Sequence, residues 1–327
     1  CVLDWLSSWK HHPDVIHVHD HHTALIPFMV KYCYKYANIS NIPTVLTIHN
    51  AQYQGWMGWD NSIFIPRWDM WKWGMLDWKN TINPLASGIK CADLVTTVSP
   101  SYLDELRQVS NGLEALFEYE KGKCVGILNG IDVHVWDPAT DTYIQHRYSI
   151  EDEEAGKAKN KMQICDEFDL DFDKPLIVFI GRLVGEKGAD ILPGVIADSF
   201  QHIGRRMNFM ILGSGFPEVE SGLESLLHLA NNDYNLYIGY NETLSHRMYA
   251  GVDFLLMPSR VEPCGLNQMY SMRYGTVPMV RRTGGLRDTV IDYGEPGGYG
   301  ICYNEASVGD VCHGVWRAVE LYRNKER

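Results

Sequence analysis

Short apolar runs rich in β-branched residues recur along this chain, with helical patterns between most of them. This alternation is typical of a parallel α/β sheet, in which ligands bind beyond the carboxyl ends of the strands. Polar clusters follow the predicted strands, so we expect a binding site at that edge. The predicted strands span residues 15–19, 44–49, 94–98, 125–128, 176–180, 208–212, 235–238, 254–257 and 277–280.

A polar stretch after residue 137 separates four of these strands from the other five. A chain of 327 residues also exceeds the usual size of one domain. We therefore predict an α/β protein of two Rossmann-like domains, each a doubly wound parallel sheet, that face each other across a cleft. The predicted bounds are 1–140 for an incomplete N-terminal domain, 141–174 for an interdomain linker and 175–327 for the C-terminal domain.

The two ends of the sequence suggest that it belongs to a longer protein. It begins at Cys1 rather than at methionine, and it ends at Arg327, at the close of a predicted helix over residues 307–324. We expect the chain to be truncated at both ends.

The composition limits the class of protein. The net charge of −12 opposes the broad basic footprint of a nucleic-acid-binding protein, so any anionic ligand needs local basic groups. Neither a membrane-spanning apolar run nor a signal sequence is evident, which predicts a cytoplasmic protein without a membrane partner. The eight cysteines are scattered without a Cys-x-x-Cys pair, so reduced thiols are expected rather than a zinc ribbon or disulfides.

The segment 259–290 combines the groups that bind a sugar joined to a diphosphate. Carboxylates and amides hold sugar hydroxyls, whereas basic side chains and backbone amides at helix N-termini hold phosphate oxygens. Glu262 lies shortly before a predicted helix over 268–274, where a carboxylate can also be a simple cap. Capping does not explain the following Gly284–Gly285 turn, which would offer further free amides, so we favour sugar or ribose binding.

The loop 181–188 follows a predicted strand and is a second candidate site. Its Arg182 and Lys187 lie where cations can hold a diphosphate. The alternative is a solvated loop whose basic residues pair with Glu186 and Asp190. Together with the segment 259–290, the loop favours diphosphate binding.

Four histidines crowd the end of the first predicted strand, at positions 17, 19, 21 and 22. Alternate strand positions share a face, which is one requirement of a metal site. Because no cysteine or further carboxylate is spaced to complete the site, we predict hydrogen-bonding roles, with Asp20 orienting a ring, and no metal.

Six of the ten tryptophans lie between Trp56 and Trp78. Aromatic faces stack on pyranose rings, so this segment is either a glucan platform or a helical excursion whose rings pack on the sheet. The sequence leaves both interpretations open.

Seven ordered motifs resemble the bacterial glycogen synthases and plant starch synthases, which are retaining glucosyltransferases of GT-B architecture. The resemblance covers nearly the whole chain. The motifs are VIHVHDHHTALIP (15–27), TIHNAQYQG (47–55), DLVTTVSPSY (93–102), GILNGIDVHVWDPATD (126–141), GRLVGEKG (181–188), GYNETLSHRMYAGVD (239–253) and the segment 259–290.

The resemblance implies roles for individual residues. Arg182 and Lys187 would hold the donor diphosphate and stabilise the charge on the leaving nucleotide. Glu262 would bind hydroxyls of the transferred glucose. Asn129 and His49 would contact its 6-hydroxyl, and the backbone carbonyl of His49 would face the developing oxocarbenium ion.

The remaining roles concern substrate binding. Tyr240 would lie against the adenine, whereas Asp20 and His22 would line the acceptor side of the cleft. The other substrate-binding positions implied are Cys264, Gly265, Leu266, Thr283, Gly284 and Gly285.

The implied reaction is transfer of glucose from ADP-glucose, or alternatively UDP-glucose, to the 4-hydroxyl of an α-1,4-glucan with retention and without a cofactor. No matched motif supplies a carboxylate nucleophile beneath the anomeric carbon, so front-face departure and attack is expected. The alternatives are another retaining GT-B transferase, such as a sucrose- or trehalose-forming enzyme, and a glucan- or nucleotide-binding fragment without turnover.

Two positions depart from the family pattern. The family's Lys-x-Gly-Gly-Leu loop, which contacts the donor phosphate and the acceptor, has no counterpart before His17. His21 stands where the family more often carries tryptophan, and either ring can pack at that turn.

Overall fold

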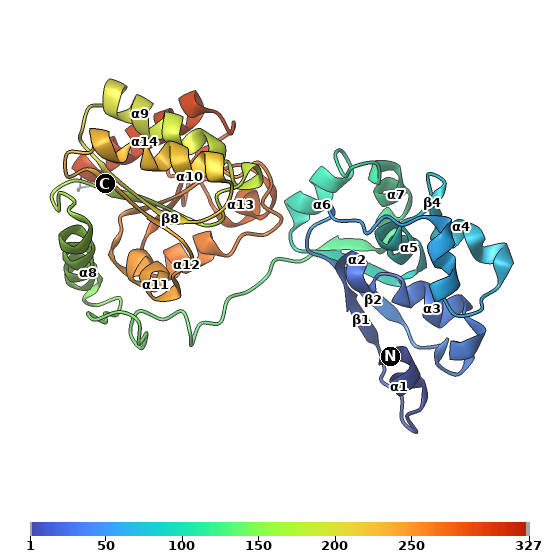
Figure 1. The fold of residues 1–327 in the computed structure, drawn as a ribbon. Coiled ribbons are helices and arrows are strands. Elements are labelled where there is room, and N and C mark those ends of the chain that lie inside the picture. Colours follow the sequence, from blue (N-terminus) through green and yellow to red (C-terminus); the bar gives the residue numbers. More distant parts are fainter. Residues whose placement is uncertain (1, 325–327) are drawn as a thin grey trace. The chain divides into compact units, whose positions relative to one another are not determined.

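The computed structural model describes residues 2–324, which divide into two compact units at the bond between Asn129 and Gly130. Each unit contains a parallel β-sheet flanked by helices (Figure 1). The predicted α/β class is therefore confirmed.

The sheet of the first unit has the strand order β1-β2-β5-β6, and every neighbouring pair is parallel. The four strands predicted for this half of the chain are all present. The short antiparallel pair β3 and β4 was not predicted, because two residues per strand carry no readable alternation. The strands are β1 (Ile16–His19), β2 (Thr44–Ile48), β3 (Asp77–Trp78), β4 (Thr81–Ile82), β5 (Leu94–Thr97) and β6 (Cys124–Gly126).

Helices of the first unit pack on the sheet through fully buried apolar residues such as Phe28, Leu46 and Ile89. The predicted start of α6 is confirmed, because the Ser99 hydroxyl accepts a hydrogen bond of 3.1 Å from the Tyr102 amide. The helices are α1 (Val2–Ser7), α2 (Asp20–Thr23), α3 (Ile26–Tyr32), α4 (Trp73–Leu76), α5 (Pro84–Cys91), α6 (Pro100–Leu106) and α7 (Glu114–Tyr119), with 3-10 turns η1 (Tyr34–Ile39), η2 (Trp59–Phe64), η3 (Met70–Lys72) and η4 (Lys121–Lys123).

The sheet of the second unit has the order β12-β11-β10-β7-β8-β9 and is parallel throughout. Five of its strands were predicted, and the three-residue strand β12 was not. The order reverses between β7 and β10, and ligands bind at such a topological switch point. The strands are β7 (Leu176–Ile180), β8 (Asn208–Gly213), β9 (Tyr234–Ile238), β10 (Phe254–Met257), β11 (Val277–Arg281) and β12 (Ile301–Tyr303).

Helices cover both faces of this second sheet (Figure 1). One apolar core packs α9, α10 and α14 against the sheet, and another packs α8, α11 and α13 against the opposite face. This is the doubly wound arrangement that was predicted. The helices are α8 (Glu153–Phe168), α9 (Leu192–His202), α10 (Pro217–Glu224), α11 (Glu242–Gly251), α12 (Asn267–Arg273), α13 (Gly284–Thr289) and α14 (Val308–Arg323), with 3-10 turns η5 (Gly185–Lys187), η6 (Ala189–Ile191) and η7 (Leu227–Leu229).

The segment 141–174, predicted as a linker, is packed within the second unit. The Tyr148 hydroxyl lies 2.8 Å from the Tyr274 carbonyl oxygen and 3.2 Å from that of Ala250. Asp141 accepts a hydrogen bond of 2.6 Å from the Tyr274 hydroxyl. The prediction failed because the few apolar and aromatic residues that anchor the segment are scattered among many polar ones.

Lys157 on α8 predicts a pH dependence of stability. Its ammonium donates to the Tyr274 carbonyl (3.0 Å) and to the Thr276 hydroxyl (2.8 Å), and burial lowers the pKa of Lys157 from 10.5 to about 8. Between these values the unfolded chain binds more protons than the folded one, so this residue makes the free energy of unfolding rise with pH. Below the folded pKa both states are protonated, and the cost of burying the charge is fully present.

Lys157→Met should remove the contribution of Lys157 to that rise. Urea unfolding at pH values below about 8 and above 10.5 measures the free energy of unfolding at both ends of the range. Cysteines and tyrosines titrate there too, so the relevant quantity is the difference between wild type and variant. Lys159→Met, at an exposed position of the same helix, should preserve the rise. If the free energy of unfolding depended on pH in the same way in wild type and Lys157→Met, Lys157 would not be the source of the pH dependence.

Candidate active site

The loop after β7 and the loop after β10 are held together by backbone contacts. The amides of Arg260 and Val261 donate to the Glu186 carbonyl at 2.8 and 3.2 Å. Gly188 has a φ of +66°, and a Cβ there would lie 2.1 Å from the Pro258 carbonyl oxygen. Only glycine permits this approach, which brings the side chains of the two loops together.

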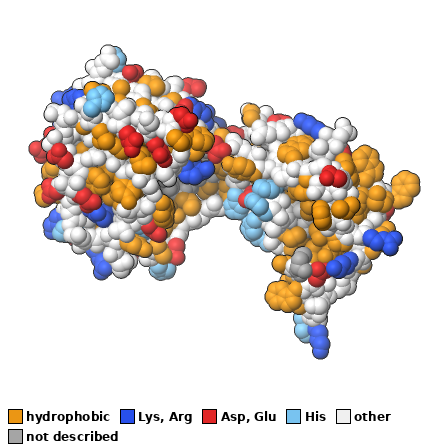
Figure 2. Space-filling model, viewed as in Figure 1, with side chains coloured by type: hydrophobic (Ala, Val, Ile, Leu, Met, Phe, Trp, Pro, Cys, Tyr) orange, Lys and Arg blue, Asp and Glu red, His pale blue; other side chains and the backbone are white. Residues whose placement is uncertain are grey.

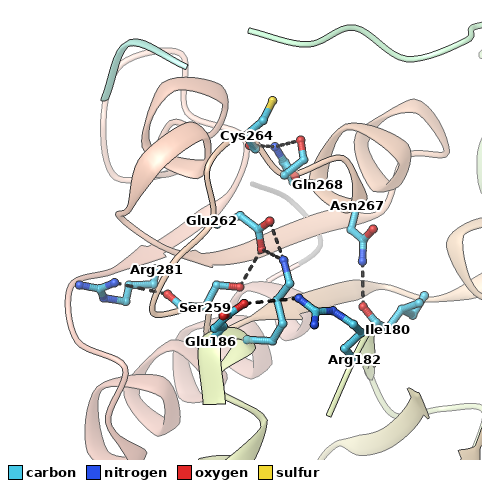
Figure 3. Close-up of polar contacts among 11 residues, drawn as sticks. Ile180, Arg182, Glu186, Ser259, Glu262, Cys264, Asn267, Gln268 and Arg281 are labelled. Atoms are coloured by element: carbon cyan, nitrogen blue, oxygen red, sulfur yellow. Dashed lines mark hydrogen bonds and ion pairs between the residues drawn. The ribbon is translucent and has the colours of Figure 1, made fainter. Parts of the chain in front are cut away.

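Glu262 is the buried acid at this junction, with 5% of its surface exposed. Both of its carboxylate oxygens lie 2.7 Å from Nζ of Lys187, and the Ser259 hydroxyl donates to Oε2 at 2.9 Å (Figure 3). The residue that precedes α12, Leu266, makes no side-chain cap. Glu262 is therefore an ion-paired carboxylate and not a helix cap, and Ser259 is a partner that the sequence did not reveal.

Arg182 lies on the same loop but is more exposed. Its guanidinium is 3.4 Å from the Glu186 carboxylate, and its side chain is 61% exposed (Figure 3). Asp190 pairs with Arg260, and Lys187 pairs with Glu262. The alternative, in which Glu186 and Asp190 neutralise the basic residues of the loop, therefore holds only for the contact between Arg182 and Glu186. A long, exposed ion pair leaves the guanidinium available to an anion.

Two adjoining cavities flank Arg182, which lines both together with Asn267. The smaller, of about 230 Å³, contains Lys187 and Glu262. The larger, of about 330 Å³, has Tyr240 in its wall. Of the two residues predicted to hold a diphosphate, Arg182 therefore lies between the two cavities, and Lys187 lies in the smaller one beside Glu262.

Tyr240 stands at the mouth of the larger cavity with 84% of its surface exposed. It precedes α11, whose predicted cap Asn241 accepts a hydrogen bond of 2.9 Å from the Leu244 amide. Sequence reasoning missed Trp136 and Tyr270 in this wall, whose rings stack with centroids 3.7 Å apart. The two residues lie 134 positions apart in the sequence (270 − 136), and nothing in that spacing indicates a contact.

The Gly284–Gly285 turn serves close packing, which corrects the prediction of free amides. The Gly285 amide donates to the Glu262 carbonyl at 3.0 Å. A Cβ at Gly284 would lie 2.1 Å from that same oxygen, and one at Gly285 would lie 2.1 Å from the Cys264 carbonyl oxygen. Thr283 is buried beside this turn. The turn supports the backbone that carries Glu262.

The turn over residues 264–266 is fixed by a side chain of the following helix. Gln268 Nε2 donates to the carbonyls of Cys264 and Gly265 at 3.0 Å each. Gly265 has a φ of +74°, and Leu266 is partly exposed in the smaller cavity. This part of the predicted site is a rigid backbone turn.

In the first unit, Asp20 holds the backbone of the loop that carries His49. Its Oδ1 accepts hydrogen bonds from the amides of His49 (2.7 Å) and Asn50 (3.3 Å). The prediction that Asp20 orients a histidine ring is therefore wrong. Its short carboxylate, at a φ of +51°, reaches the backbone of the neighbouring strand end.

The histidines form a connected group at this strand end. His19 Nδ1 lies 3.1 Å from His49 Nε2, and burial together with the nearby His17 and His49 lowers the pKa of His19. The rings of His21 and His22 are in contact. Within residues 2–324, no group of three or more histidine, cysteine or acidic side chains is arranged to hold a metal ion.

The structure thus gathers the predicted residues into one group in each unit. Arg182, Lys187, Glu262 and Tyr240 line these two adjoining cavities in the second unit. Asp20, His22 and His49 lie at the ends of β1 and β2, while Asn129 is exposed after β6 at the end of the first unit.

Comparisons with known proteins agree with this architecture. Residues 1–119 match the family model "starch synthase catalytic domain", and residues 163–321 match "glycosyl transferases group 1". The catalytic domain of Arabidopsis thaliana starch synthase IV, solved with ADP and acarbose, is 30% identical with a TM-score of 0.87, covering 99% of this chain and 68% of that one. Sucrose-phosphate synthase from Thermosynechococcus elongatus, 16% identical with a TM-score of 0.62 over 98% of this chain and 67% of its own, shares the fold.

These findings define the chain as a glycosyltransferase with the GT-B fold. Glycogen synthase of Flavobacterium johnsoniae is 55% identical over 99% of this chain and 68% of its own length, and that of an Anaeromyxobacter species is 40% identical over 96% and 66%. The chain belongs to the glycogen synthase family. It spans about two thirds of the length of these relatives.

Proposed function

We propose that this protein transfers glucose from ADP-glucose to the 4-hydroxyl of an α-1,4-glucan, with retention of configuration. The observation that carries the proposal is the Lys187–Glu262 pair in the smaller cavity, beside Arg182, which lines both this cavity and the adjoining one. Such a site offers cations to a diphosphate, a carboxylate to a sugar and an aromatic ring to a nucleobase. The starch synthase that was solved with ADP and acarbose supports both the nucleotide and the glucan.

Lys187 and Arg182 would neutralise the charge that develops on the leaving ADP. A lysine ammonium has three N–H donors, and two of them are directed at Glu262. The third is then available to a phosphate oxygen. Because Glu262 already holds the ammonium in place, the positive charge is preorganised, which is the condition for strong electrostatic stabilisation of a transition state.

Glu262 would accept hydrogen bonds from hydroxyls of the transferred glucose. Its two oxygens already receive Lys187 and Ser259, so it is a poor candidate for a nucleophile that attacks the anomeric carbon. We therefore favour front-face departure and attack, with the donor phosphate taking the acceptor proton. The loop that Asp20 holds would present the His49 carbonyl to the developing oxocarbenium ion.

The partners follow from the same proposal: a nucleotide sugar and an α-1,4-glucan, with no nucleic acid. Arg182 and Lys187 supply the positive charge that the diphosphate requires, so no cofactor is proposed. No helix in residues 2–324 is long and apolar enough to cross a membrane. The seven described cysteines are free thiols, which supports a cytoplasmic location.

Tyr240→Ala is expected to raise KM for ADP-glucose about tenfold, because the exposed ring is the face on which adenine would stack. The turnover number at saturating donor should change little, since the ring does not touch the transferred glucose. Tyr240→Phe should retain wild-type KM. An unchanged KM in steady-state kinetics of Tyr240→Ala would show that the base binds elsewhere.

The stereochemistry is tested by NMR of the first product formed from ADP-glucose and a short maltooligosaccharide. A new α-linked residue at the non-reducing end supports retention, whereas a β-linked one contradicts it. A trapped covalent glucosyl-enzyme would contradict front-face attack and would support double displacement. Sucrose or trehalose formation would indicate a different GT-B transferase, and ADP binding without any transfer would indicate a binding fragment.

A further inference from the structure

His246 on α11 is a buried histidine that the proposed reaction does not use. A group of histidine side chains lies on the surface of the first unit near α2 (Figure 2), whereas His246 is fully buried in the second unit. Burying a polar ring is unfavourable unless hydrogen bonds compensate for the lost water. The contacts of this side chain therefore indicate what the position requires.

One ring nitrogen of His246 is tied to a buried carboxylate. Nδ1 lies 2.7 Å from Oδ2 of Asp141, and because an ionised carboxylate only accepts hydrogen bonds, Nδ1 is the donor. The same oxygen accepts from the Tyr274 hydroxyl at 2.6 Å, and Oδ1 accepts from the Tyr143 amide at 2.7 Å. These bonds fix Asp141, and Asp141 in turn fixes the orientation of the imidazole ring.

The other ring nitrogen of His246 is unpaired. Nε2 is buried and has no hydrogen-bond partner among residues 2–324. Leaving a buried polar atom unpaired is unfavourable. Phenylalanine would fill the same space without that cost, but it could not bond to Asp141. The position thus requires an aromatic face together with one hydrogen-bond donor.

The face of the imidazole ring stacks on the indole ring of Trp136. Their centroids lie 4.0 Å apart, and their planes are inclined by only 10°. Tyr270 also stacks on Trp136, with centroids 3.7 Å apart and planes inclined by 16°. The ring of Tyr143 contacts His246 with centroids 4.5 Å apart. His246 therefore belongs to a group of four aromatic rings in contact.

Trp136 depends on such contacts because neither a helix nor a strand carries it. It lies in the segment that connects β6 to α8, and its neighbours Val133 and Val135 are about half exposed. Its carbonyl accepts a hydrogen bond of 3.2 Å from Nε of Arg273, which holds the backbone. The position of the indole ring is set by the side chains that stack on it, and His246 is one of them.

The rings of Trp136 and Tyr270 form part of the wall of the larger cavity, which Arg182 and Tyr240 also line. His246 is not among the residues that line this cavity. It can therefore influence a ligand there through Trp136 but not by contact. A wall that is fixed before the ligand arrives lowers the entropy cost of binding.

We propose that His246 is a positioning residue for the nucleotide. Held by Asp141, it fixes the ring of Trp136 in the wall of the larger cavity, and that ring packs against the nucleoside part of the donor. This role rests on the proposed function, because it takes the larger cavity as the site of the nucleotide. Binding of ADP tests it without any turnover.

The first measurement is the dissociation constant of ADP by isothermal titration calorimetry. His246→Asn keeps a donor for Asp141, because the amide nitrogen takes the place of Nδ1, but it removes the stacked ring. ADP should bind to it about tenfold more weakly, and KM for ADP-glucose should rise by the same factor with little change in kcat. His246→Phe keeps the ring and loses the bond to Asp141, so it should unfold at a lower temperature yet bind ADP within about threefold of wild type.

A double-mutant cycle shows whether the effect of His246 passes through Trp136. Trp136 is partly exposed, so Trp136→Leu should fold, and alone it should weaken ADP binding about tenfold. Adding His246→Asn to Trp136→Leu should then change the affinity little further, because the two residues act as one unit. Fully additive losses would overturn the proposal, and so would wild-type affinity for ADP in Trp136→Leu.

Tyr234→Phe is the matched control for stability. Tyr234 is buried on β9, in the core that contains α9, α10 and α14, and its hydroxyl donates to the Leu223 carbonyl at 2.9 Å. The variant should unfold at a lower temperature but bind ADP as wild type does. An equal loss of ADP affinity in Tyr234→Phe would overturn the proposal, because the effect would then follow stability alone. If the cycle gives the expected result in a protein that transfers no glucose, the proposed function fails and the positioning role stands.

Discussion

Glu262→Ala is expected to reduce turnover by a factor of roughly a hundred or more, corresponding to about 2.7 kcal/mol of lost transition-state stabilisation. The variant removes the carboxylate that would hold the glucose hydroxyls and also frees Lys187, which lies 2.7 Å from both of its oxygens. Lys187→Ala should cause a comparable loss, because it removes the cation next to the diphosphate. Steady-state kinetics with ADP-glucose as the varied substrate provide the measurement.

Controls must separate chemistry from stability, because Lys187→Ala leaves Glu262 buried without its cation. Glu262→Gln keeps the shape and one acceptor oxygen but loses the charge and the second acceptor, so it should fold and still turn over slowly. If ADP binds to both alanine variants and the melting temperatures stay close to that of wild type, the lost rate belongs to catalysis. Near-normal rates in these variants would mean that the site is misassigned.

Gly188→Ala should destabilise the second unit by about 3 kcal/mol or more. The position has a φ of +66°, which disfavours any Cβ, and the added carbon would lie 2.1 Å from the Pro258 carbonyl oxygen. Relief requires the loops after β7 and β10 to separate, and that separation would also pull Lys187 away from Glu262. Chemical unfolding and activity should therefore decline together.

Two other glycines serve as controls for this effect. Gly204 has a φ of +78° but open space around its Cβ position, so Gly204→Ala should cost only about 1 kcal/mol through backbone strain. Gly309 lies in α14 with nothing within 4 Å, and Gly309→Ala should cost nothing. Equal effects at Gly188 and Gly204 would show that the contact with Pro258 does not matter.

The alternation of apolar runs predicted every strand of the two sheets that is longer than three residues, because burial on both faces gives continuous apolar runs. The strand β12 and the two-residue strands of the pair β3–β4 were not predicted, although β6, which also has three residues, was. The segment 141–174 packs within the second unit, although its polar composition predicts a linker. A few side chains, such as Tyr148 and Asp141, hold it there through hydrogen bonds, and the composition does not reveal these contacts.

The sequence motifs identify the residues of the site, but they do not show which of these residues pair with each other. Lys187 and Glu262 lie 75 positions apart, and they meet because β7 and β10 are neighbours at the point where the strand order reverses. Strand order is a property of the assembled sheet. Likewise, the Gly284–Gly285 turn predicts free amides but packs against backbone carbonyls, because glycine in a sequence does not show whether the missing side chain admits a ligand or another backbone segment.

The most direct test of the proposed function is transfer of labelled glucose from ADP-glucose to glycogen by the purified protein, with UDP-glucose as the competing donor. We expect label to enter the polymer faster from ADP-glucose, and to be released by an exo-hydrolase specific for α-1,4 linkages. Transfer should be slower by a factor of roughly a hundred or more in Glu262→Ala. The absence of label in glucan from either donor, in a protein that binds ADP, would contradict the account.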